Sequence, residues 1–406
     1  YSTNECTEDM AIVAHEHSCT ADKQTCDCGY TCTHPAFENG ICSTCGYTCQ
    51  HTDVDETTAK CKTCGTTFVV KVTKGETTSY SADLAEALNT AENGTTISLL
   101  TNVELDKAAV IREDGKIVIL NLNGHSISAN PRGDFSIGAE AAFEQSRTSA
   151  TLKITGNGDV RSRIIIFGGT LDLSDWAGDT IDYVSVYGKT DSGAAAKLIV
   201  GEKAGYIGSL IFTSWTPDQK GIVQLKGGSY GIIQLQCYED IEVKLGELLA
   251  DGYAFKNIDD GNFVNYTAKI AYSYSNGPTP IGSVQVVKCP HGGDASADTG
   301  SYRCAYCNTE VTASVSDGKT TGYYATLQDA LDRAKTGDTV TLLTASNANY
   351  EIKKAITLDL MGNAIGEVSC SATGIKITDS AESKGKIKKL TVSSGMLKDL
   401  LPEGYG

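Results

Sequence analysis

The chain has 406 residues, 40% of them hydrophobic, and a formal net charge of −16. Such a negative field repels phosphate groups and argues against nucleic acids and anionic membranes as partners. No apolar run approaches the roughly 20 residues that a membrane helix needs, so we expect no membrane insertion in this fragment. The 42 glycines and 19 tyrosines beside only 7 prolines are typical of a turn-rich β protein. A start at Tyr1 instead of Met suggests a processed or excised fragment.

The N-terminal part of the chain is unusually rich in cysteine and histidine. Ten of the fifteen cysteines lie within residues 1–64. Residues 1–31 are expected to form a variant Cys/His module with an open choice of fourth ligand, because Cys6 can replace Cys19 and either of two histidines can serve. Its candidate metal ligands are His15, His17, Cys19, Cys26 and Cys28.

A Cys-x-His pair followed by Cys-x-x-Cys occurs three times and predicts zinc knuckles at 32–48, 49–70 and 289–313. Three thiolates and one imidazole complete a closed tetrahedral set for structural Zn²⁺, whose binding would supply the folding free energy of so small a module. The alternative is a disulfide framework, which does not account for the recurring histidine. The predicted ligands are Cys32, His34, Cys42 and Cys45, then Cys49, His51, Cys61 and Cys64, then Cys289, His291, Cys304 and Cys307.

Residues 75–101 and 318–344 are an internal repeat, with 14 of 27 aligned positions identical. The same offset of 243 residues carries Cys61 onto Cys304 and Cys64 onto Cys307. The repeating unit is therefore a knuckle together with the domain that follows it. Such arrays usually build length and binding surface rather than one catalytic pocket.

A short amphipathic helix is predicted in each copy, near 83–93 and near 326–336. Asp83 and Thr326 have capping-box spacing, and Gly94 and Gly337 are expected to end the helices. Each helix is placed to cap the open end of a β-helix. The apolar stripes are Leu84, Ala87, Leu88 and Ala91 in the first copy, and Leu327, Ala330, Leu331 and Ala334 in the second.

Short β-branched runs separated by Gly, Asn, Asp and Ser follow each helix. Hairpin dipeptides are scarce, which favours parallel coils over a meander. We therefore predict a mostly β fold, a right-handed parallel β-helix in two segments. The first occupies 71–272, a linker 273–288, and a second, shorter β-helix 314–406.

Several phrases resemble known proteins. LAEALNTAENGTTISLL at 84–100, LNLNGHSI at 120–127, LLADGYAF at 248–255 and LDLMGNAI at 358–365 resemble β-helical repeat regions of large cell-surface proteins from Gram-positive gut bacteria. The knuckle CTHPAFENGICSTCGYTC at 32–49 is similar to modules of the same proteins. The resemblance implies a secreted or wall-attached, non-enzymatic adhesin that meets a host glycan or a host protein such as immunoglobulin. No catalytic residue carries over.

Aromatic side chains fall across consecutive coils, where they either present a ligand-binding ladder or fill the coil interior. The alternative function is a glycoside hydrolase-like enzyme with paired carboxylates around Trp176, which would stack on a sugar. The same carboxylates also fit solvated turns, and acidic turns are candidates for Ca²⁺. The candidate binding aromatics are Trp176, Tyr183, Tyr187, Trp215 and Tyr230, and the candidate carboxylates are Asp172, Asp175, Asp179 and Asp182.

Overall fold

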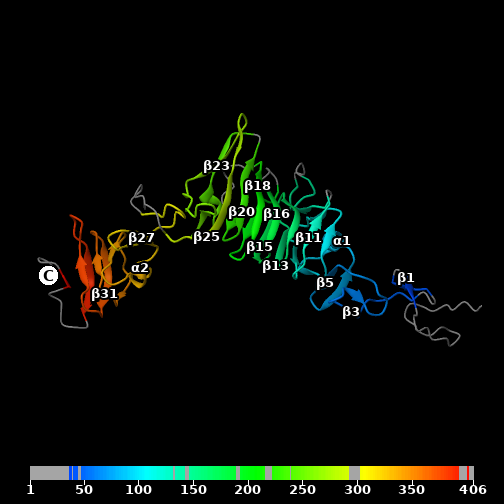
Figure 1. Cartoon of the computed structure of the whole chain (residues 1–406), viewed down its shortest axis with the longest axis horizontal. Coiled ribbons are helices and arrows are strands. Elements are labelled where there is room, and N and C mark those ends of the chain that lie inside the picture. The colour runs from blue at the N-terminus through cyan, green and yellow to red at the C-terminus, as the bar shows by residue number, and fades with distance from the viewer. Residues whose placement is uncertain are drawn as a thin grey trace, which may run out of the picture.

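The computed structural model describes residues 36–38, 40–43, 47–130, 133–141, 146–188, 193–214, 222–237, 239–291, 302–392 and 400–401. The molecule is elongated, and its parts follow one another in chain order along the long axis (Figure 1). The fold is mostly β and is built on parallel solenoid coils with small Cys/His modules, as the sequence predicts.

The first solenoid has two long parallel sheets. Each coil adds one strand to each sheet, and two extra strands, β9 (Ala109–Ile111) and β12 (Phe135–Ile137), widen the second sheet over the first coils. The first sheet contains β7 (Thr95–Leu99), β10 (Ile117–Asn121), β13 (Thr151–Gly156), β15 (Gly169–Trp176), β17 (Ala196–Val200) and β19 (Val223–Leu225). The second contains β8 (Val103–Leu105), β11 (Ile127–Ala129), β14 (Val160–Ile166), β16 (Thr180–Tyr187), β18 (Tyr206–Thr213) and β20 (Ser229–Gln236).

The core runs between these sheets as stacked columns of apolar side chains. Alternation along each strand points every second residue inward. Leu152, Leu171 and Leu198 are successive partners in register on β13, β15 and β17, and each has 0% exposure. The coil interior is therefore a continuous packed core.

Two elements cover the N-terminal end of this core. A hairpin of β5 (Val70–Lys74) and β6 (Thr77–Ser81) pairs antiparallel with β7. The predicted helix α1 (Leu84–Thr90) begins at Asp83, whose carboxylate accepts the Glu86 N–H, and the side chain of Asn89 accepts a 2.6 Å hydrogen bond from Val110 N–H of β9. The helix thus satisfies part of an otherwise open strand edge.

The predicted glycine stops are wrong. Helix α1 ends at Thr90 with Ala91 as its C-cap, three residues before Gly94. Gly94 has a φ of +80° and donates its N–H to Ile117 O at 2.8 Å, and Gly337 does the same to Ala355 O. These glycines start the next coil instead of ending the helix.

The linker predicted at 273–288 is also wrong. Residues in this range form β24 (Gly277–Thr279) and β25 (Ile281–Lys288). Strand β25 pairs antiparallel with β20 and with β22 (Tyr253–Asn257), and its Val284 and Val286 are buried. Strand β25, whose apolar residues alternate with polar ones, thus closes the last coil. Beside it, β21 (Ile241–Lys244), β23 (Lys269–Ser273) and β24 form a projecting three-stranded sheet (Figure 1). The 3-10 helix η1 (Leu245–Leu248) follows β21 and buries Leu245 and Leu248 in the core of the first solenoid.

The second segment repeats the start of the first. A hairpin, a helix begun by Thr326 and a first parallel strand follow at the same offset of 243 residues, and the segment has a separate core. Its elements are β26 (Ala313–Ser316), β27 (Thr321–Tyr324), α2 (Leu327–Arg333), β28 (Thr339–Leu342), β29 (Tyr350–Ile352), β30 (Thr357–Asp359), β31 (Ala364–Cys370), β32 (Lys376–Thr378) and β33 (Lys386–Val392).

Candidate metal centres

Two described knuckles bring their four predicted ligands together. In the first, a ribbon of β3 (Val54–Asp55) and β4 (Lys60–Cys61) leads into a loop in which Cys61 N–H donates to Thr66 O at 2.9 Å. In the second, Cys304 N–H donates to Thr309 O at the same distance. This tight loop turns both cysteines of Cys-x-x-Cys toward one point.

The histidines reach the same point through an unusual backbone conformation. His51 and His291 have φ values of +52° and +51°. Residues other than glycine rarely adopt this left-handed backbone conformation, so its recurrence at both histidines reflects a shared requirement of the module. The residue after the second cysteine is also left-handed in both copies, Gly65 in the first and Asn308 in the second.

The distances between ligand atoms suit a tetrahedral metal ion. The Cys49 and Cys61 Sγ atoms are 3.6 Å apart, and Cys64 Sγ is 3.3 Å from His51 Nδ1. A zinc tetrahedron with bonds of about 2.3 Å to sulfur and about 2.0 Å to nitrogen has edges of about 3.8 Å and about 3.5 Å. A disulfide needs sulfurs about 2.0 Å apart, so these thiols are not bridged.

The second set has the same geometry. Its Cys289 and Cys304 Sγ atoms are 3.5 Å apart, and Cys307 Sγ is 3.4 Å from His291 Nδ1. In each set all ligand atoms lie within 4.8 Å of one another, so both groups can hold a metal ion. Elsewhere in the described ranges no three Cys, His, Asp or Glu side chains converge in this way.

Hydrogen bonding within the second set lowers the pKa of one thiol and raises that of the histidine. Hydrogen bonds with Cys289 and Cys304 hold the pKa of the Cys307 thiol well below its usual range. Hydrogen bonds to Cys304 and Cys307 raise the pKa of His291 to about 9. Because a metal takes thiolates and neutral imidazole, its binding releases protons from this set, and affinity falls in acid.

A threonine missed by the sequence analysis supports each thiolate. Cys64 Sγ lies 3.1 Å from the Thr66 hydroxyl, and Cys307 Sγ lies 3.2 Å from the Thr309 hydroxyl. Burial alone would raise the pKa of the Cys64 thiol, but hydrogen bonds with Thr66 lower it below its ordinary value. Each thiol donates to its threonine hydroxyl, and once the thiol loses its proton to bind a metal the same hydroxyl can donate to the sulfur and stabilise the thiolate. The signal was the shared pattern Cys-x-x-Cys-x-Thr at 61–66 and 304–309.

The knuckle predicted at 32–48 is described only in part. Cys42 N–H donates to Tyr47 O at 2.8 Å, and Cys49 N–H donates to Gly40 O at 2.9 Å. Equivalent bonds occur nineteen residues later, from Cys61 to Thr66 and from Phe68 to Ala59. The described residues around Cys42 thus repeat the hydrogen bonding found around Cys61. Other predicted ligands lie outside the described residues, namely Cys32, His34 and Cys45, and in the module at 1–31, His15, His17, Cys19, Cys26 and Cys28.

The second knuckle contacts both solenoid segments. Tyr266 N–H, from the end of the first segment, donates to Ala305 O at 2.8 Å, and Tyr323 N–H of β27 donates to His291 O at 3.0 Å. The rings of Phe263 and Tyr306 stack with centroids 5.1 Å apart. One apolar cluster combines Ala254 and Phe263 from the first segment, knuckle cysteines, and Tyr323 and Leu343 from the second.

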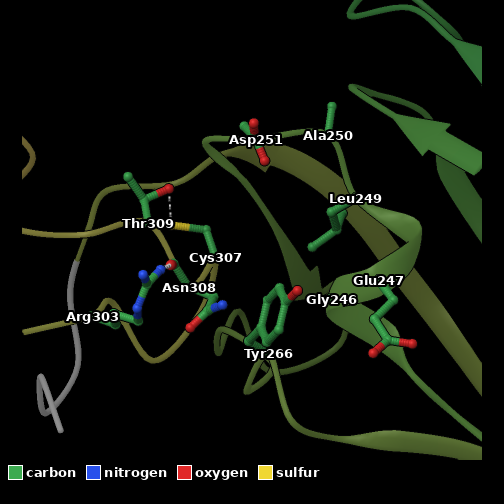
Figure 2. A pocket seen from close by; sticks show the side chains of 10 residues that line it. All are labelled: Gly246, Glu247, Leu249, Ala250, Asp251, Tyr266, Arg303, Cys307, Asn308 and Thr309. Carbon is green, nitrogen blue, oxygen red and sulfur yellow. Dashed lines mark hydrogen bonds between the residues drawn. The ribbon is translucent and has the colours of Figure 1, made fainter. Parts of the chain in front are cut away.

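A pocket of about 490 Å³ lies at this joint (Figure 2). Glu247 and Tyr266 of the first segment line one side, and Arg303 and Cys307 of the knuckle line the other. The Arg303 guanidinium donates a 2.9 Å hydrogen bond to Asn308 O, which fixes it against its own loop. The pocket is therefore lined by one of the predicted metal ligands, Cys307.

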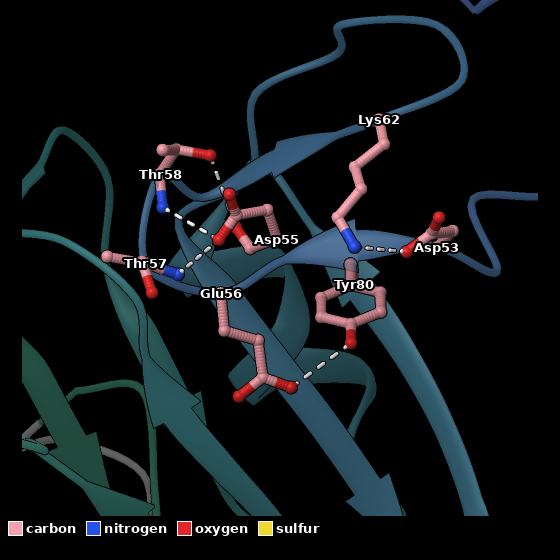
Figure 3. Close-up of polar contacts among 7 residues, drawn as sticks. All are labelled: Asp53, Asp55, Glu56, Thr57, Thr58, Lys62 and Tyr80. Carbon is pink, nitrogen blue, oxygen red and sulfur yellow. Dashed lines mark hydrogen bonds and ion pairs between the residues drawn. The ribbon is translucent and has the colours of Figure 1, made fainter.

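The first knuckle is joined to its own solenoid by polar contacts, of which Figure 3 shows the one between Glu56 and Tyr80, and by aromatic packing. Glu56 accepts hydrogen bonds from Lys71 of β5 at 2.7 Å and from Tyr80 of β6 at 3.3 Å. The Phe68 ring packs against His51 and Tyr80, with centroids 5.0 and 5.6 Å away. The predicted metal ligand His51 is thus linked through Phe68 to Tyr80 of the hairpin that begins the solenoid.

Two predicted binding aromatics are instead core residues. Trp176 and Tyr230 are fully buried, because both occupy inward positions on their strands. Trp176 Nε1 donates to Gly158 O at 3.1 Å, and the Tyr230 hydroxyl donates to Gly227 O at 2.9 Å. Tyr183 and Tyr187 are half-buried on β16, and Trp215 lies outside the described residues. Because they are fully buried, Trp176 and Tyr230 cannot stack on a ligand.

The carboxylates around Trp176 have local structural partners. Asp172 accepts a 2.8 Å hydrogen bond from Ser174 N–H, which is turn chemistry, and Asp175 forms an ion pair with Lys153 of the neighbouring coil. The buried Trp176 cannot serve as the sugar platform of the hydrolase alternative. That alternative therefore loses the aromatic residue on which it was built.

In the described part of the chain no helix is long and apolar enough to cross a membrane. No protein-family model, curated protein or solved structure matches the chain.

Proposed function

We propose that this chain is a non-enzymatic, extracellular bacterial scaffold, secreted or attached to the cell wall, in which zinc knuckles join solenoid segments into one extended adhesin. The observation that carries this proposal is the joint at the second knuckle. One apolar cluster there contains the ligand cysteines together with residues of both solenoids. A metal ion bound at Cys289, His291, Cys304 and Cys307 would thus hold the segments in a fixed relation.

Zinc is the ion best suited to these sites. Three thiolates and one imidazole in a closed tetrahedral arrangement are a structural zinc set, because catalytic zinc keeps one position open to water. Neither knuckle has a sizeable core of its own, so metal binding would contribute directly to its folding.

A substitution at the joint between the two solenoid segments tests the proposal. Cys304→Ser, which removes a ligand, is compared with Cys370→Ser, which changes a buried cysteine inside the second solenoid. We expect elemental mass spectrometry to show the loss of one zinc per chain only in the first. Small-angle scattering should then show a broader distribution of lengths. Full zinc content, or an unchanged scattering profile after zinc loss, would contradict the proposed joint.

Adhesion is the part of the proposal that rests on resemblance and on elongated shape. A host glycan or a host protein such as immunoglobulin is the expected partner of a gut surface scaffold. Immobilised immunoglobulin and mucin glycans, tested against the zinc-loaded chain by surface plasmon resonance, separate these two partners. Binding to neither would remove adhesion from the proposal and leave the structural role.

A further inference from the structure

The outer face of the second sheet contains a hollow of about 250 Å³ between β16 and β23. It arises where small side chains lie among large ones. Ser185 is 3% exposed and follows Tyr183 and precedes Tyr187 on the same face of β16, so two large rings flank a short hydroxyl side chain. Tyr272 of β23 lines the hollow as well.

The floor of the hollow is polar. The Ser185 and Thr213 hydroxyls are 3.2 Å apart, and both residues are buried. Gln236 is the register neighbour of Thr213 on β20, is exposed and lines the same hollow. Hydroxyl and amide groups that both donate and accept hydrogen bonds therefore lie beside aromatic rings.

The walls are held in place by their surroundings. The Tyr187 ring packs against Phe167 with centroids 4.7 Å apart, and the Arg147 guanidinium lies 5.9 Å from the Tyr187 centroid. Arg163, at the rim, pairs through Nε and Nη2 with the Asp134 carboxylate, which balances its charge. A preformed hollow without an unbalanced charge at its rim favours a neutral ligand.

We propose that this hollow binds one neutral pyranose unit of a glycan. Tyr183 and Tyr272 line the hollow and would supply aromatic surface for the C–H side of a sugar ring, while Ser185, Thr213 and Gln236 offer partners for its hydroxyls. The hollow is smaller than the sites of drug-sized ligands, which occupy about 300–1,000 Å³, and suits a single ring. This assignment rests on the proposed role of the chain as a binding scaffold and names the class of its ligand.

Saturation-transfer NMR on the full zinc-loaded chain tests the site. The probes are the methyl glycosides of galactose, glucose, mannose, fucose, N-acetylglucosamine and N-acetylgalactosamine, each at millimolar concentration. We expect at least one to receive saturation and to bind about tenfold more weakly to Tyr183→Ala. Ser185→Trp, which fills the hollow, should abolish binding.

Two further variants separate loss of the site from loss of the fold. Gln236→Ala alters an exposed rim residue and should weaken binding severalfold with no change in thermal unfolding, whereas Tyr206→Ala, at an exposed position of β18 outside the hollow, should bind as the parent does. No transfer to any of the six glycosides, or transfer that survives both Tyr183→Ala and Ser185→Trp, overturns the proposal. If the scattering profile changes on zinc loss but no glycoside binds, only this site is refuted. If a glycoside binds but the scattering profile is unchanged after zinc loss, only the joint is refuted.

Discussion

Trp176 offers a sharp test of whether the aromatic residues of the first solenoid are structural. Its side chain is fully buried in the coil interior, and its Nε1 donates to Gly158 O at 3.1 Å. Replacement by alanine removes the largest side chain of the core and costs about 3–5 kcal/mol of unfolding free energy. With a urea m-value of about 3 kcal/mol per molar, the midpoint should fall by about 1–1.7 M.

The assay can use the residue itself, because the chain has only two tryptophans. In a Trp215→Phe background the fluorescence of Trp176 should be blue-shifted and resistant to acrylamide. Urea unfolding of Trp176→Ala is then followed by circular dichroism, with Tyr206→Ala at an exposed position as the matched control, where a change within about 0.5 kcal/mol is expected. Red-shifted, quenchable emission together with an unchanged midpoint would refute the buried placement.

Three other outcomes follow from particular contacts. Burial alone would raise the pKa of Asp83, but the Lys107 ion pair and helix N–H groups lower it, so its stabilising effect is present above about pH 4 and is lost in acid. Thermal melts between pH 5 and pH 3 should therefore show that the parent loses up to about 1 kcal/mol more unfolding free energy than Asp83→Asn does. Equal losses in the two proteins would contradict the ion pair. Burial raises the pKa of Cys370 to about 11, so peptide mapping after alkylation at pH 8 should find this thiol unmodified until the protein unfolds, and early modification would show that it is accessible. Val284→Asp places a charge in the buried face of β25 and should lower the melting temperature of the first solenoid by several degrees, whereas Gln285→Asp on the other face should not, and equal effects would argue against β25 as the closing strand.

Local spacing carried most of what the sequence could reveal. The Cys-x-His and Cys-x-x-Cys order placed Cys49, His51, Cys61 and Cys64 at one point because all four belong to a short loop and ribbon. The helix start at Asp83 was equally local.

Features that depend on neighbouring coils were not predictable in the same way. Whether Trp176 points inward depends on the phase of its strand, which is set by turns that a single segment does not reveal. The hollow beside Tyr183 needs the register of β14, β16, β18 and β20 together with the overlying β23. Strand β25 was also not predicted, because the strand with which it pairs, β20, lies about fifty residues earlier in the chain.

The closing strand β25 has a consequence for how such a molecule lengthens. A coil inserted within the first solenoid would need only to match its two neighbours, but a coil added beyond β20 would meet an antiparallel strand in place of an open parallel edge. Growth past that point requires a new start, and the knuckle with its hairpin and helix supplies one, as it does at residues 289–333. Duplication of the whole cassette would therefore extend the chain in discrete units, each beginning with a group of Cys and His residues that could hold a metal ion.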